Sequence, residues 1–124
     1  MISYIAKWNG SPPDDRVKSI MELGQMTAAI FTPHVNTGFR VRIDPNHIVE
    51  MTLTSVSEGG SSPQIENFTL HFLAPPNAPA RQGSYAMVHD VLGEFELFVV
   101  PVGRDARGVE YEAVFNRLRD SRWE

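Results

Sequence analysis

The chain has 124 residues, a hydrophobic fraction of 42%, a net charge of −4 and no cysteine. This length and composition suit one globular domain, and the lack of cysteine excludes disulfides, thiol catalysis and thiolate metal sites. The acidic balance argues against non-specific nucleic-acid binding, which needs a basic surface against the phosphates.

The sequence shows no signal-peptide pattern at its N-terminus, and no window is long and apolar enough to span a bilayer. We therefore expect a cytoplasmic protein of bacterial or viral origin. We expect it to have neither a membrane nor a nucleic acid as a partner.

A helix is predicted over residues 12–23, within the stretch SPPDDRVKSIMELG. Ser11 is the expected N-cap, Pro12 stands at the first helical position, and Gly24 suits a left-handed helix exit. We assign residues 1–26 to an N-terminal extension that carries this helix.

A second, very short helical turn is predicted for the sequence AAIF, capped by Thr27. Pro33 disfavours helical geometry at the residue before it, so the turn must end there.

Apolar residues then recur at every second position, which is the period of a strand. Residues 39–43 and 49–53 form two such runs on either side of the turn sequence DPNH. Val56 is out of phase with the second run, so we expect a bulge or a strand end near Ser55.

A third strand is predicted at residues 65–74 and a fourth from Ser84, with the proline-rich stretch PPNAPARQG between them. Two further runs, 94–99 and 109–115, are joined by the loop GRDARG into a hairpin. Pro101 cannot donate to a strand ladder, so we place it at a sheet edge or a bulge.

Four glutamates in this hairpin raise the question of acid–base chemistry. Alternation puts them on the face opposite the large apolar side chains, and no His or Lys accompanies them locally. We interpret them as the solvated side of a sheet. Because that face also carries Phe98, Val100 and Val114, we expect part of it to contact the N-terminal helix or another chain. The acids are Glu94, Glu96, Glu110 and Glu112.

The histidines offer little sign of chemistry. None stands in an HxH or HExxH arrangement, and no glycine-rich loop stands between a strand and a helix. We therefore predict no catalytic residue, no cofactor and no metal. The strands of His71 and His89 are consecutive, so their pairing could bring these two side chains together near a glutamate. The histidines are His34, His47, His71 and His89.

Several pieces of the chain follow a familiar order: FTPHVNTGFRVRID, VEMTLTSVSE, ENFTLHFLAPPNAPARQGSYAMVHDVLGEFELFVVPVG and YEAVFN. Over residues 27–116 this order resembles an uncharacterised family of small bacterial domains of unknown function. The resemblance implies no activity, cofactor or catalytic residue. Such domains look like accessories to phage-tail-like or tail-collar proteins.

We expect a mainly β fold: a small antiparallel barrel or sandwich of about six strands, closed at one end or face by one or two short N-terminal helices. The β domain would cover residues 27–117, and residues 118–124 would form a charged C-terminal tail.

The function expected first is a non-enzymatic interaction or assembly module that contacts a protein partner or its own copies. A small-ligand or carbohydrate-binding barrel is the alternative, and a hydrolase or isomerase built from His71, His89 and a glutamate comes last. A large apolar cavity would favour the ligand barrel, whereas a filled interior with an exposed apolar patch would favour the interaction module. The candidate interaction residues are Arg81, Gln82, Arg104, Asp105, Arg107, Phe98 and Val100.

Overall fold

The computed structural model describes residue 21 and residues 25–59 and 65–118. Apart from Met21, the helix predicted over residues 12–23 lies outside these residues. The elements are α2 (Ala28–Phe31), the 3-10 turn η3 (Thr32–His34), β1 (Gly38–Asp44), β2 (His47–Glu58), β3 (Ile65–Ala74), β4 (Gly83–His89), β5 (Gly93–Asp105) and β6 (Gly108–Leu118).

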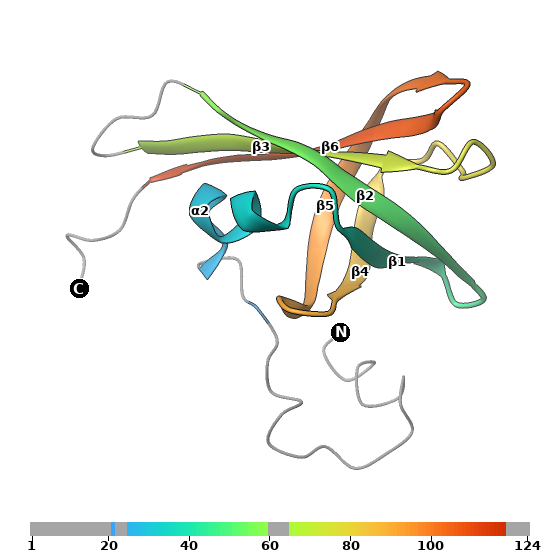
Figure 1. Ribbon diagram of the computed structural model, residues 1–124, viewed down its shortest axis with the longest axis horizontal. Coiled ribbons are helices and arrows are strands. Elements are labelled where there is room, and N and C mark those ends of the chain that lie inside the picture. The colour runs from blue at the N-terminus through green and yellow to red at the C-terminus, as the bar shows by residue number, and fades with distance from the viewer. Residues whose placement is uncertain (1–20, 22–24, 60–64, 119–124) are drawn as a thin grey trace, which may run out of the picture.

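The strands close into an antiparallel barrel in the order β1-β2-β3-β6-β5-β4 (Figure 1). The chain builds two meanders, β1 to β3 and β4 to β6, each from strands that are neighbours in sequence. A long ladder between β3 and β6 joins the meanders on one side. A ladder of three residue pairs between β1 and β4 closes the ring on the other. The predicted fold class is confirmed.

Two irregularities in the ladders match the sequence. The register of β2 against β3 shifts between Leu53 and Ser55, where Val56 falls out of phase. The register of β5 against β6 shifts between Pro101 and Gly103, so Pro101 lies at a bulge. The hairpin turn is shorter than predicted. The strands continue through much of GRDARG, and only Ala106 and Arg107 form the turn.

The barrel interior is filled by the apolar side chains that strand alternation points inward. Phe39 packs edge-on against Phe72 and Phe95, with ring centroids 5.4 and 6.1 Å apart. The predicted inward aromatics are all buried: Phe39, Phe68, Phe72, Tyr85, Phe95, Tyr111 and Phe115.

The short helix α2 lies below the β3–β6 arm in the view of Figure 1. The Thr27 hydroxyl caps it by accepting a hydrogen bond from the Ile30 N–H at 3.2 Å, as predicted. One helical turn is unstable alone, so tertiary packing must hold it. Phe31 supplies that packing, because its fully buried ring lies 6.0 Å from the ring of Phe95. In the part of the chain that the structure describes, no helix could cross a membrane.

Candidate functional site

The strands β5 and β6 pair only near their shared turn, from Val100 opposite Glu112 to Asp105 opposite Gly108. Beyond that point, residues 93–99 of β5 pair with β4, whereas residues 113–118 of β6 pair with β3. Figure 1 shows the result: away from their shared turn at the upper right, β5 extends toward the bottom of the view and β6 extends to the left. We call the gap between residues 93–99 and residues 113–116 the seam.

The seam holds a groove of about 430 Å³. Two large apolar side chains at this groove are exposed on the outer surface: Phe98 is 53% exposed and Val114 is 63% exposed. Deeper in the groove, Leu97 and Phe115 belong to the buried core. The groove therefore leads from an exposed apolar rim to the barrel core.

The backbone of β5 is open toward the seam. The Met21 N–H donates to the Glu94 carbonyl at 2.8 Å, so this carbonyl points away from β4. Because backbone groups alternate in direction along a strand, those of Glu96 and Phe98 point the same way. Within the described residues, neither has a ladder partner on that side.

The outer face beside the seam is acidic. Glu94, Glu96, Glu110 and Glu112 all lie on it, opposite the core, which confirms the predicted alternation. All four are half-buried, and Glu94 departs furthest from the solvated state predicted for it. Its Oε1 atom is buried without a hydrogen-bond partner, and burial raises the pKa of its carboxyl.

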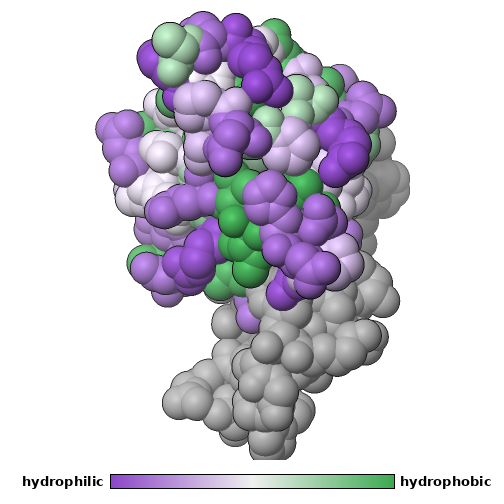
Figure 2. All heavy atoms as spheres, turned by 90° about the vertical axis from the view of Figure 1, so that its right-hand side faces the viewer, coloured by the Kyte–Doolittle hydropathy of each residue, from purple (hydrophilic) through white to green (hydrophobic). Residues whose placement is uncertain are grey.

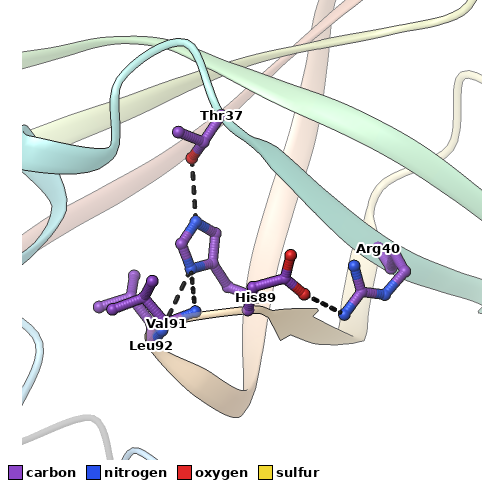
Figure 3. Close-up of polar contacts among 6 residues, drawn as sticks. Thr37, Arg40, His89, Val91 and Leu92 are labelled. Atoms are coloured by element: carbon purple, nitrogen blue, oxygen red, sulfur yellow. Dashed lines mark hydrogen bonds and ion pairs between the residues drawn. The ribbon is translucent and has the colours of Figure 1, made fainter.

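A second polar cluster closes the barrel end around His89, which is 4% exposed (Figure 3). Its Nδ1 atom accepts hydrogen bonds from the Val91 N–H at 3.0 Å and the Leu92 N–H at 3.1 Å. An accepting Nδ1 carries no proton, so Nε2 holds the proton and donates to the Thr37 hydroxyl at 2.9 Å. That hydroxyl donates to the His34 carbonyl at 2.6 Å.

His89 is thereby held as a neutral imidazole. Burial is the main cause that lowers its pKa, and the neighbouring His34, whose ring centroid lies 4.7 Å away, lowers it further. Beside this ring, Arg40 pairs with Asp90 at 2.9 Å. Both ring nitrogens are used inside the fold, so the cluster ties the segment before β1 to the β4–β5 turn.

The model of a family described as a domain of unknown function, DUF6916, matches residues 26–115. The chain belongs to this family. The match begins at buried Met26 and ends at Phe115, so it covers α2 and reaches into every strand of the barrel. The resemblance to an uncharacterised domain family is confirmed. Neither a curated protein nor a solved structure matches the chain.

In this DUF6916 domain, the strands of His71 and His89 are not paired with each other. The expectation that strand pairing could bring the two side chains together is therefore wrong. Their strands are consecutive in sequence, but β3 pairs with β2 and β6 whereas β4 pairs with β1 and β5. His89 also points into the barrel end, whereas His71 lies among outward-facing residues.

His71 instead joins three strands on the outside of the DUF6916 barrel. Its Nε2 lies 3.1 Å from the Ser57 hydroxyl, and its Nδ1 lies 3.6 Å from Glu112 Oε2. The order Ser-His-Glu is that of a hydrolytic relay. None of the three lines the seam groove or the second groove beside α2. The backbone around His71 and Glu112 belongs to the β3–β6 ladder, whereas β2 around Ser57 pairs with β3 on one side and, within the described residues, has no β1 partner beyond Thr52.

The candidate loop residues take different places. Arg104 donates to the Pro76 carbonyl at 2.8 Å and the Ala78 carbonyl at 3.3 Å, so it fastens the proline-rich loop. At the exposed hairpin tip, Arg107 pairs with Asp105 at 3.1 Å. The side chains of Arg81 and Gln82 are exposed.

The proline-rich loop and the β5–β6 turn both lie at the right in Figure 1. Figure 2 turns that side to the viewer and shows a mainly polar surface with one narrow apolar strip. Phe98 and Val100 lie on β5, with Phe98 lining the seam groove and Val100 at the point where the strands part.

Across residues 21, 25–59 and 65–118, no group of three His, Asp or Glu side chains could hold a metal ion.

Proposed function

We propose that this DUF6916 domain is a non-enzymatic interaction module that binds an extended segment of a protein partner along the seam. The observation that carries the proposal is the Met21 N–H bonded to the Glu94 carbonyl. It supports the seam edge of β5 as an acceptor for backbone donors from outside the sheet. The same edge continues through Glu96 and Phe98 without a ladder partner among the described residues.

The distribution of apolar side chains also supports an interaction module over a ligand-binding barrel. Phe39, Phe72 and Tyr111 are fully buried and help to fill the interior. In contrast, Phe98 and Val114 are exposed beside a groove that opens outward. An exposed apolar patch with a polar surround is typical of a protein-binding surface.

The setting that we propose is a bacterial cytoplasmic assembly of the phage-tail-like or tail-collar kind. It rests on the family resemblance drawn from residues 27–116. In such a setting a small adaptor would bind a strand of a larger structural protein.

The test is to pan a display library of random linear peptides against the immobilised full chain. We expect enriched peptides whose binding falls at least tenfold with Phe98→Asp. Ile48→Asp is the matched control, because Ile48 is 57% exposed on β2, away from the seam. Thermal unfolding of both variants checks that they fold. Failure to enrich peptides, or enriched peptides that ignore Phe98→Asp, would overturn the proposal.

A further inference from the structure

The open edge of β5 determines the conformation of anything that fills the seam. Backbone groups of Glu94, Glu96 and Phe98 point into it, and Glu94 already accepts one backbone N–H. Only an extended segment presents N–H and C=O groups at the matching two-residue spacing. The opening ends where Val100 meets Glu112, so a strand of about five residues fits along β5 once it displaces the Met21 N–H from the Glu94 carbonyl.

The side chains around the seam determine which residue types the segment needs. In a paired strand, alternate side chains would lie on the outer face, level with Glu94, Glu96 and Phe98. The intervening side chains would point inward, toward Leu97 and the core. Inward positions therefore call for apolar residues, as does the outer position beside Phe98.

The outer positions beside Glu94 and Glu96 call for cations. The buried Oε1 atom of Glu94 has no hydrogen-bond partner. Arg40, which the β1–β4–β5 register aligns with Glu94, pairs with Asp90 instead. A lysine or arginine in the segment would meet these carboxylates, and an acidic residue would be repelled.

We infer that the seam takes an extended strand of about five residues with apolar inward positions and lysine or arginine beside Glu94 and Glu96. This inference rests on the proposed function and names the chemistry of the partner segment. The direction of the bound segment relative to β5 determines which end of its sequence carries the two lysines. An antiparallel segment would read Val-Val-Lys-Val-Lys, and a parallel one Lys-Val-Lys-Val-Val.

The test uses these two sequences as fluorescent peptides with blocked ends, each beside a counterpart in which both lysines are replaced by glutamate. Fluorescence anisotropy with the full chain gives the affinities. We expect one lysine peptide to bind at least tenfold more tightly than its acidic counterpart. Glu96→Lys should abolish this preference. Glu110→Lys makes the same charge change on β6 outside the groove and should preserve it.

Amide hydrogen exchange of the full chain completes the test. The N–H groups of Glu96 and Phe98 should exchange quickly in the free chain and slowly with the bound peptide. Slow exchange in the free chain would overturn the inference, because the chain itself or a second copy would then fill the seam. The solution mass separates those two occupants.

The two proposals can fail separately. If panned peptides are sensitive to Phe98→Asp but show no preference for basic residues, the chemistry inferred here is wrong and the interaction module stands. If no peptide binds in a manner that depends on Phe98, both are overturned.

Discussion

His89 and Thr37, 52 residues apart in sequence, are joined by a 2.9 Å hydrogen bond from the imidazole Nε2 to the threonine hydroxyl. The bond depends on a neutral ring, because Nδ1 must remain free to accept the N–H groups of Val91 and Leu92. The hydrogen bonds that close this end of the barrel therefore depend on the protonation state of His89.

The free energy of unfolding should fall as the pH drops below about 6.5, the pKa of a free histidine. The pKa of His89 is lowered in the folded chain, mainly by burial, so in this range the unfolded chain binds the extra proton. Guanidinium unfolding at pH 8 and pH 5.5 measures the loss. His89→Gln should reduce it, whereas His47→Gln, at an exposed position, should retain it. Equal losses in all three proteins would contradict this account.

Glu94→Gln should raise stability at pH 7. Burial raises the pKa of this carboxyl, so the folded chain holds the proton more tightly than the unfolded chain does. The associated stability is present in acid and is lost as the pH rises through the folded pKa. An uncharged glutamine avoids that loss at pH 7. The gain in stability from Glu94→Gln should therefore vanish near pH 4, where the loss has not yet set in. Glu110→Gln is the control, with a change below about 0.5 kcal/mol at both pH values. A destabilised Glu94→Gln at pH 7 would refute the prediction.

Gly108→Ala should cost about 1–3 kcal/mol. Gly108 opens β6 with a φ of 149°, and a methyl group there would overlap the backbone carbonyl oxygen of Ala74. Gly103→Ala is the matched control in the same hairpin, because its methyl group would lie 3.6 Å from Glu110 Oε1, an ordinary contact. Urea unfolding of the two variants compares them, and equal stability would argue against strain at Gly108.

Tyr85→Phe should loosen the proline-rich loop. The Tyr85 hydroxyl donates to the Arg81 carbonyl at 2.6 Å, and its loss should cost about 1 kcal/mol. Limited trypsin digestion followed by mass spectrometry should show faster cleavage after Arg81. Cleavage after Arg107, at the exposed hairpin tip, serves as an internal control and should not change. An unchanged rate at Arg81 would mean that the loop is held by Arg104 and Tyr111 alone.

Much of the barrel could be predicted because strand alternation is a local signal. The period of two assigned the inner face of each strand, and the out-of-phase Val56 located a register shift. The Thr27 cap and the bulge at Pro101 followed from the chemistry of single residues. The length of the β5–β6 turn could not be predicted in this way, because the glycines at both ends of GRDARG suggested a loop where the strands in fact continue.

The candidate site could not be predicted because it depends on the order of strands around the ring. Sequence neighbours suggested that β3 would pair with β4, whereas β6 lies beside β3 and the seam opens on the other side of β6. Ser57 was missed for a related reason. It follows the bulge in β2, where the inside and outside positions exchange, and its contact with His71 needs the β2–β3 register.

The long β3–β6 ladder has a consequence for synthesis on the ribosome. The first meander is synthesised early, but one side of β3 has no strand partner until β6 is synthesised, after every other strand. Until then the rings of Phe68 and Phe72 lack the partners that β6 supplies, including the stacked ring of Phe115. A nascent chain stalled before β6 should therefore expose apolar surface and bind chaperones. Pull-down of stalled ribosomes would detect the bound chaperones. Productive folding of this protein is a late event that follows translation of almost the whole domain.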